Sequence, residues 1–206
     1  MAVGVKPTPL QMAPVVVLPA PIYRLSVAQY QQMARAGILT EEDRVELLEG
    51  VLVTKMGKNP PHVWSSCQTQ NALLRLVPAG WCVYQEQPLV ADESTPEPDG
   101  MVVRGRWEDY KGRPPHAAEA VLIVEVADSS LQRDQQEKRR IYARAGIPIY
   151  WIINLIGLRI EVYTDPTGPD ALPDYRMRRD YGPDDEVPLV IEGREVARLA
   201  VRDLLP

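Results

Sequence analysis

The chain has 206 residues, enough for one domain with a hydrophobic core and too few to favour two. Its formal net charge of −5 argues against a protein that coats nucleic acid indiscriminately, although a local basic surface remains compatible with it. With only two histidines and two cysteines, the chain excludes a histidine-rich metal site and a Cys/His zinc cluster. Any metal site must therefore use carboxylates, which favours Mg²⁺ or Mn²⁺.

The N-terminal stretch, residues 1–21, is rich in proline and has no periodic pattern. We expect a flexible arm there, followed by a single domain over residues 22–206. The apolar piece Val15–Leu18 is too short for a secretion signal, and no segment reaches the length of a membrane span. Nothing indicates an oxidising compartment, so we expect a cytoplasmic protein, no membrane contact, and Cys67 and Cys82 as reduced core residues.

The first predicted elements are a helix and a hairpin. Ser26 and Gln29 form a possible capping box, and the apolar spacing that follows predicts a helix that ends near Ala36. Glu49–Gly50 then separates two short apolar runs, which predicts a tight hairpin over residues 46–53. In that hairpin Glu46 opens the first strand.

A second long helix is predicted before Pro78, which ends the pattern. Its apolar positions recur at helical spacing, which indicates the buried face: Val63, Cys67, Leu74 and Val77.

Strand patterns dominate the rest of the chain. The near-continuous apolar run Ala120–Val126 indicates a central strand covered on both faces. Ser129 or Ser130 can cap a following helix, which runs to about Ala145. The order predicts an α/β or α+β fold, a mixed central sheet flanked by helices. Its further strands are predicted at residues 81–90, 101–103, 149–154 and 158–163, with short strand-like runs from 165 onward and a last one at 196–205.

Glu125 interrupts the central apolar strand. A carboxylate in such a place normally needs a charged partner or a metal to offset its desolvation, which makes it a candidate site residue. On the following helix, Asp134 and Lys138 share a stripe with apolar residues and should face the sheet. Taken alone, that pair is more simply interpreted as an i,i+4 salt bridge. Pro98-Asp99 alone is a weak signal, common in turns.

Together, Pro98-Asp99, Glu125 and Lys138 resemble the PD-(D/E)XK nuclease superfamily. More narrowly, the chain resembles the Uma-two family of restriction-endonuclease-like proteins from about Ile22 to Pro206. The matching pieces are YRLSVAQY, VELLEGVLV, His62 at the start of a helix, EPDGMVV, VLIVEVADSS, Asp134 with Lys138, and AGIPIYWIIN.

The resemblance implies a restriction-endonuclease-like core in which Asp99 and Glu125 hold a divalent cation and Lys138 supports the attacking water. Glu46 would be an additional acidic ligand. The superfamily's usual lysine, two residues after the glutamate, is replaced by Ala127, and Lys138 on the next helix would fill its role.

Two further residues join this set as supporting candidates. His62 matches a histidine position of the family and could contact phosphate or a catalytic residue, although a structural hydrogen bond explains it equally well. Asp134 accompanies Lys138 on the inward stripe. Tyr142 is interpreted as a core residue.

The leading hypothesis is a metal-dependent endonuclease that hydrolyses phosphodiester bonds, with DNA as the partner and Mg²⁺ or Mn²⁺ as the cofactor. A homodimer would allow both strands of a duplex to be cut. One alternative is a catalytically silent nuclease fold that serves as a binding or regulatory module. A weaker alternative is a hydrolase of smaller phosphate esters, which a narrow pocket would favour.

Overall fold

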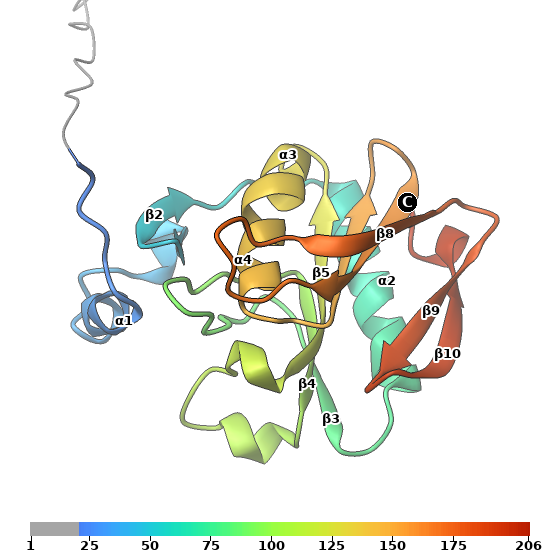
Figure 1. The fold of residues 1–206 in the computed structure, drawn as a ribbon, viewed down its shortest axis with the longest axis horizontal. Helices are drawn as coiled ribbons and strands as arrows, with labels where there is room; N and C mark the ends of the chain where they lie inside the picture. Colours follow the sequence, from blue (N-terminus) through green and yellow to red (C-terminus); the bar gives the residue numbers. More distant parts are fainter. Residues whose placement is uncertain (1–20) are drawn as a thin grey trace, which may run out of the picture.

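The computed structural model describes residues 21–206, so nearly all of the predicted arm lies outside the described residues. The centre of the fold is a six-stranded mixed sheet in the order β3-β4-β5-β6-β7-β8 (Figure 1). Only β5 and β6 run parallel, and the other neighbours pair antiparallel. The predicted mixed α+β fold is thus confirmed. The strands are β3 (Trp81–Tyr84), β4 (Gly100–Arg104), β5 (Ala120–Ala127), β6 (Ile149–Asn154), β7 (Arg159–Pro166) and β8 (Tyr175–Tyr181).

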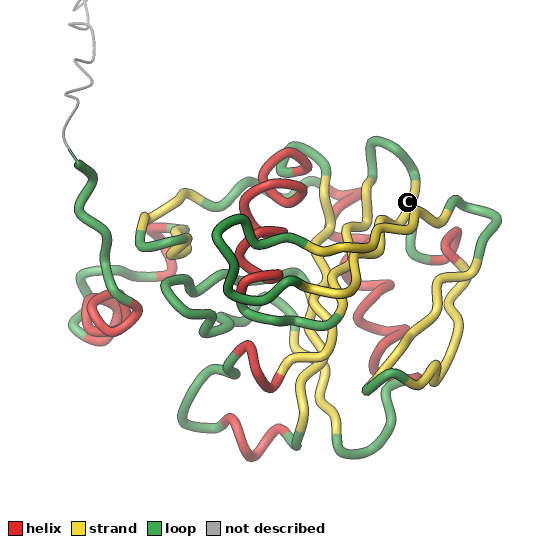
Figure 2. The backbone as a smooth tube through the Cα atoms, viewed as in Figure 1, coloured by secondary structure: helices red, strands yellow, loops and turns green. Residues whose placement is uncertain are grey.

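The central strand β5 is where the apolar run placed it. All eight of its residues are buried, as expected for a strand covered on both faces. One face carries Ile123 and Glu125 and packs beneath the helical segment that follows the strand. The other face carries Val124 and Val126 and packs against α2 and the C-terminal strands. Figure 2 shows helices on both sides of the sheet.

The helical segment after β5 is not uniformly α-helical. It consists of α3 (Leu131–Arg133), a π-helical turn (Asp134–Lys138) and α4 (Arg139–Arg144). π-helical turns inside α-helices are rare and occur often at functional sites. Here the turn carries both charged residues of the predicted inward stripe. Ser130, one of the two predicted caps, occupies the N-cap position, but its side chain makes no capping hydrogen bond within the described chain.

Helix α2 (Pro60–Leu76) covers the other face, but its buried side differs from the predicted one. Val63 and Leu74 are about half exposed and Cys67 is exposed, so the prediction of Cys67 as a core residue is wrong, whereas Cys82 is buried. The buried positions are mostly small and polar: His62, Ser65, Ser66, Thr69 and Leu73.

Small side chains let α2 lie close to the sheet and to the C-terminal tail. The Ser65 hydroxyl donates to the Leu204 carbonyl, and the Ser66 hydroxyl accepts from Gln85 Nε2 at 2.9 Å. These partners are distant in sequence, which is why helical periodicity alone selected the wrong face. The C-terminal strands β9 (Glu186–Ile191) and β10 (Arg194–Ala200) form a separate two-stranded sheet on this side.

Strand β3 is shorter than predicted. It ends at Tyr84, and Glu86 adopts a left-handed backbone with φ of 52°. Pro88 removes a ladder donor from the next stretch. The chain continues as a loop whose Leu89 side chain is fully buried, so the apolar pattern beyond Tyr84 reflects burial of a loop and not a continued strand.

The N-terminal part lies to one side of the main sheet (Figure 1). Helix α1 (Val27–Arg35) begins with the predicted capping box of Ser26 and Gln29, and no described residue of α1 is buried. Strands β1 (Val45–Leu48) and β2 (Val51–Thr54) form the predicted hairpin. Its turn residues Glu49 and Gly50 both have positive φ, as a type I′ turn requires. Across the described residues, no helix is long and apolar enough to cross a membrane.

Candidate functional site

Four residues singled out from the sequence come together at one buried place. Glu46 comes from β1, Asp99 directly precedes β4, Glu125 lies near the end of β5, and Lys138 closes the π-helical turn. In the same order, these four residues are only 3, 8, 3 and 6% exposed. A cluster of ionisable groups so deeply buried is costly to maintain, so its internal contacts decide what it can do.

Lys138 is the cationic centre of this cluster. Its Nζ lies 2.8 Å from Glu125 Oε1 and 3.5 Å from Glu46 Oε2. Burial lowers the pKa of Lys138, but the carboxylates of Glu125, Glu46 and Asp134 outweigh burial and raise that pKa above its ordinary value. Lys138 therefore stays protonated at neutral pH.

Glu125 also accepts a hydrogen bond from the Tyr142 hydroxyl, with 2.7 Å between Tyr142 Oη and Glu125 Oε1. Tyr142 is fully buried, as predicted for a core residue, yet its hydroxyl reaches the site. Burial is the largest influence on Glu125 and raises its pKa to about 8, although the Lys138 charge acts in the opposite direction. Without a further cation, Glu125 thus tends to hold a proton at neutral pH.

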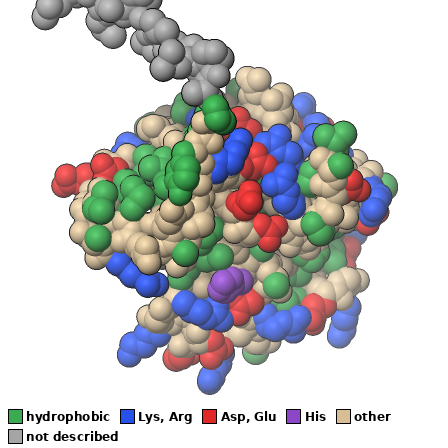
Figure 3. All heavy atoms as spheres, turned by 60° about the vertical axis from the view of Figure 1, so that its left-hand side comes forward, with side chains coloured by type: hydrophobic (Ala, Val, Ile, Leu, Met, Phe, Trp, Pro, Cys, Tyr) green, Lys and Arg blue, Asp and Glu red, His purple; other side chains and the backbone are tan. Residues whose placement is uncertain are grey.

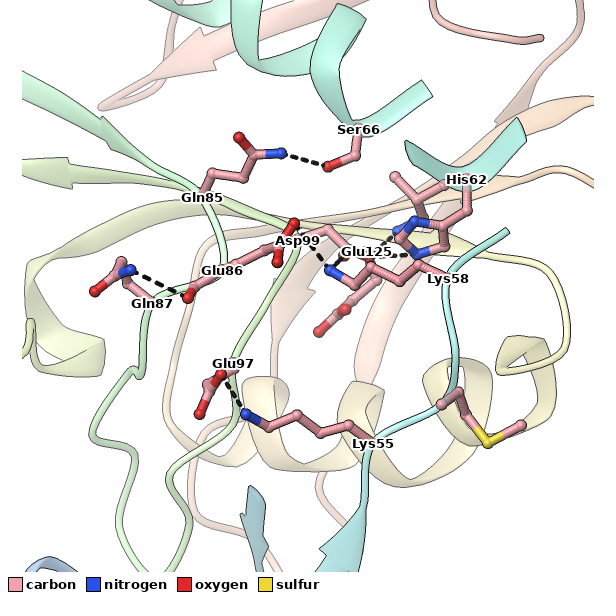
Figure 4. Close-up of polar contacts among 12 residues, drawn as sticks. Lys55, Lys58, His62, Ser66, Gln85, Glu86, Gln87, Glu97, Asp99 and Glu125 are labelled. Atoms are coloured by element: carbon pink, nitrogen blue, oxygen red, sulfur yellow. Dashed lines mark hydrogen bonds and ion pairs between the residues drawn. The ribbon is translucent and has the colours of Figure 1, made fainter. Parts of the chain in front are cut away.

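Asp99 has a different environment. Its Oδ2 accepts from the Val126 backbone N–H at 2.8 Å and lies 3.2 Å from His62 Nε2, while its Oδ1 lies 2.8 Å from Lys58 Nζ (Figure 4). Burial raises the pKa of Asp99, but the hydrogen bonds and charges of His62 and Lys58 outweigh burial and lower that pKa to about 2. Asp99 is therefore ionised over the whole physiological range.

Asp134 completes the acidic set. It is 2% exposed, and its Oδ2 is buried without a hydrogen-bond partner among residues 21–206. Burial raises its pKa to about 6, against the influence of Lys138. A buried carboxylate oxygen without a partner is unusual and calls for an explanation such as an ion or a water molecule.

The charge balance of the cluster suits a divalent cation. Four buried carboxylates, Glu46, Asp99, Glu125 and Asp134, face two ammonium groups and one histidine. Carboxylate oxygens are the ligands that Mg²⁺ and Mn²⁺ prefer. The described residues contain no ready group of three or more His, Cys, Asp or Glu side chains placed to hold a metal. Lys58 and Lys138 contact the carboxylates instead, so a cation would have to displace these lysines or share the carboxylate oxygens with them.

The cluster lies at the floor of an open cleft of about 1360 Å³. One wall is formed by the core of the protein, and the other by α1 and the turn after it, including Tyr30 and Arg35. Figure 3 shows the side of the molecule on which α1 lies, with acidic and basic side chains mixed over its centre. Basic residues recur around the cleft: Arg35, Arg44, Lys55, Lys58, Arg113 and Arg133.

Lys58 was not among the residues predicted for the site, and Tyr142 was predicted as a core residue only. Lys58 lies in the loop between β2 and α2, where a lone lysine before Asn59 carries no pattern that distinguishes it from a solvated residue. Its contact partner Asp99 is 41 residues away. His62, by contrast, was a candidate, and its Nε2 lies 3.2 Å from Asp99 Oδ2, a contact that fits both of its interpretations.

Comparisons with known proteins place this geometry in context. A family model, Uma2, described as "putative restriction endonuclease", matches residues 27–201. Among solved structures, the fold is similar to a "putative nuclease belonging to DUF820" from Anabaena variabilis, with a TM-score of 0.64 and 15% sequence identity. That match covers 87% of this chain and 97% of the other. No curated protein matches the chain.

At 15% identity, the solved structure establishes the likeness of the folds and nothing more. The family match is the stronger finding because it extends over most of the chain and includes Glu46, Asp99, Glu125 and Lys138. The family match supports a nuclease. The chain belongs to the Uma2 family of restriction-endonuclease-like proteins.

Proposed function

We propose that this protein is a divalent-metal-dependent endonuclease that hydrolyses phosphodiester bonds of DNA. The observation that carries the proposal is the burial of Glu46 and Glu125 around Lys138, with the buried Asp99 lining the same open cleft. A structural salt bridge would need one carboxylate for one lysine. The excess of acids is accounted for if the site is built for a doubly charged ion.

Asp99 and Glu125 would hold Mg²⁺ or Mn²⁺, with Glu46 as an additional ligand. When bound, such an ion stabilises negative charge on the phosphoryl oxygens and lowers the pKa of a bound water. Lys138 would donate to the attacking water or to the phosphate and thereby orient them. Tyr142 fixes the Glu125 carboxylate by its hydrogen bond, and the buried Asp134 Oδ2 has no hydrogen-bond partner among residues 21–206.

The shape of the cleft favours a polymeric substrate. Small-molecule sites enclose most of their ligand, whereas this cleft is open and carries basic side chains along its rim. Arg35, Arg44 and Arg133 all line this cleft and can contact phosphates of a backbone. This is why we propose a nucleic acid in preference to a small phosphate ester.

The test is cleavage of supercoiled, linear and single-stranded DNA, and of RNA, with Mg²⁺ or Mn²⁺ and with EDTA. We expect metal-dependent cleavage of DNA by the wild type and none by Asp99→Ala. Asp165→Ala is the matched control, because Asp165 is exposed and pairs only with Arg176 in the described chain. Absence of both cleavage and calorimetric metal binding would refute the proposal.

A second candidate function is a catalytically silent module that binds nucleic acid. It is favoured by Ala127 at the superfamily's lysine position and by the lysines that contact Asp99 and Glu125. Cleavage by the wild type that is lost in Glu125→Ala would reject it. The homodimer and the cytoplasmic location stay predictions.

A further inference from the structure

Lys58 holds the most exposed position among the cations that contact the acidic cluster. It belongs to the loop of residues 55–59 between β2 and α2, and its side chain is 31% exposed, compared with 8% for Lys138. Its Nζ lies 2.8 Å from Asp99 Oδ1 and 3.0 Å from Glu86 Oε1. Figure 4 shows Lys58 reaching Asp99 from this loop while His62 reaches it from α2.

Two lysines connect the same loop to the same neighbouring segment. Lys55 Nζ lies 2.5 Å from Glu97 Oε2, and Lys58 contacts Asp99 two residues further on (Figure 4). The acids of the two ion pairs differ in burial: Glu97 is half-buried, whereas Asp99 is a buried member of the cluster. Lys58 also contacts Glu86. Lys55 therefore serves as a natural comparison for Lys58.

Lys58 and a metal ion would compete for the same oxygen. Asp99 Oδ2 already accepts from the Val126 N–H and lies 3.2 Å from His62 Nε2, which leaves Oδ1 as the atom that Lys58 covers. A cation that binds Asp99 must take this oxygen or share it. Because Lys58 has a flexible side chain on an exposed loop, it can leave, whereas Lys138 is enclosed by its partners.

We propose that Lys58 is a phosphate-binding residue of this site that serves as the counter-ion of Asp99 until a divalent cation binds. The inference rests on the proposed function. On metal binding the Lys58 ammonium leaves Asp99 for the cleft, where the nearest new anion is the phosphate of the substrate. Asp99 thus has a balancing charge in both states, and the substrate gains a contact only after the metal has bound.

The test measures Mn²⁺ affinity by calorimetry on the wild type, Lys58→Met and Lys55→Met. A cation in contact changes the proton affinity of a carboxylate by about ten- to a thousandfold, so we expect Lys58→Met to bind Mn²⁺ at least about tenfold more tightly than the wild type. Lys55→Met removes the same charge from the same loop and should change Mn²⁺ affinity only slightly. Lys58→Arg should retain the wild-type affinity.

A second measurement follows the binding of a fluorescent DNA duplex in Ca²⁺. Lys58→Met should bind the duplex more weakly, with a salt dependence reduced by about one phosphate contact. Opposite effects on metal and DNA affinity distinguish this role from a structural one, since a loop that loses its order would weaken both. Unchanged duplex affinity would overturn the phosphate contact.

The outcomes separate this inference from the proposed function. If the wild type binds Mn²⁺ and Lys58→Met binds it no more tightly than Lys55→Met does, the role of Lys58 is overturned and the proposed function stands. If neither the wild type nor Lys58→Met binds Mn²⁺, the proposed function fails, and the role of Lys58 fails with it.

Discussion

Two buried glutamates in the same row of the central sheet have opposite electrostatic environments. Glu125 on β5 pairs in register with Ile152 on β6, and Ile152 pairs with Glu161 on β7. The two carboxylates therefore lie on the same face, two strands or about 10 Å apart. Their exposed fractions are 3% and 0%. Burial alone does not distinguish them.

The hydrogen-bond partners distinguish the two glutamates. Glu161 accepts from Gln135 Nε2 at 2.9 Å, from Asn154 Nδ2 at 2.8 Å and from the Tyr163 hydroxyl at 2.8 Å, and Arg178 approaches to 3.2 Å. Burial raises the pKa of Glu161, but these donors outweigh it, and the pKa lies below its ordinary value.

Glu125 has two donors, Lys138 and Tyr142, and three acidic neighbours, and its pKa is raised to about 8. The comparison shows how a structural carboxylate differs from one available for chemistry. Glu161 has all the donors it needs from the protein, and a further cation would gain nothing there. Glu125 is short of positive charge, which is the condition under which a carboxylate binds a metal.

The largest expected effect concerns catalysis. Glu125→Gln should reduce metal-dependent cleavage by about a thousandfold or more, because metal stabilisation of the transition state is worth several kcal/mol. Glu161→Gln should retain most of the wild-type rate. Initial rates on a plasmid substrate at saturating Mn²⁺ measure both. Equal losses in the two variants would end the distinction between the glutamates.

Stability should respond in the opposite order. Glu161→Ala leaves the donors of Gln135, Asn154 and Tyr163 without an acceptor, at about 1–3 kcal/mol each, so we expect a loss of at least about 3 kcal/mol in the free energy of unfolding. Glu125→Gln resembles the protonated acid and should change it by less than about 1 kcal/mol. Urea unfolding in EDTA at about pH 5, where Glu125 is itself protonated in the folded protein and Glu161 is still ionised, is the measurement. A larger loss in Glu125→Gln would mean that Glu125 is a structural residue.

The pH dependence of stability should differ in sign. The folded-state pKa of Glu125 is raised from 4.5 to about 8, so its contribution is present at low pH and is lost as pH rises toward 8. In EDTA, Glu125→Gln should therefore gain stability relative to the wild type between about pH 5 and pH 8, by at most about 1.4 kcal/mol per pH unit.

The pKa of Glu161 is lowered, so its contribution is present at neutral pH and is lost as pH falls below the ordinary value of 4.5. Urea midpoints of the wild type, Glu125→Gln and Glu161→Gln, measured from below pH 4.5 to pH 8, test the opposite pH dependences of the two glutamates. If the stability of the two variants changed with pH in the same way, the opposite pKa shifts assigned to Glu125 and Glu161 would be contradicted.

The smallest effect concerns the charge near Glu161. Arg178 contacts both Glu161 and Asp180, and its side chain is 39% exposed. Solvent screens such a pair, so Arg178→Ala should cost less than about 1 kcal/mol, and the cost should shrink with added salt. Thermal unfolding of the wild type and Arg178→Ala at two salt concentrations measures this cost. A large, salt-sensitive loss would show that charge, and not the neutral donors, stabilises Glu161.

Much of the fold follows from local sequence patterns. The apolar run of β5, the hairpin with its Glu49–Gly50 turn and the capping box of α1 all lie where the residues indicated. Each depends on neighbours close in sequence or on burial of both faces. The buried side of α2 was predicted wrongly because long-range partners determine it, among them Leu204, which lies 139 residues beyond Ser65.

The candidate site likewise has features that local sequence predicts and features that depend on long-range contacts. A carboxylate within an apolar strand and an inward charged pair on the next helix were visible in the sequence, and the structure brings Glu46, Asp99, Glu125 and Lys138 together. Their roles stay predictions. The π-helical turn and the contact of Lys58 with Asp99 could not be predicted, because the residues of the turn have ordinary helical propensity and Lys58 depends on a loop conformation.

The cleft has walls of unequal stiffness. The core wall includes the central sheet, whereas α1, which contributes to the opposite wall, has no buried residue among those described. Amide protons of α1 should therefore exchange with solvent through local opening at little cost, while those of β5 exchange only with global unfolding. A substrate wider than the resting cleft would be admitted by displacement of this one helix, without loss of the carboxylate geometry beneath it.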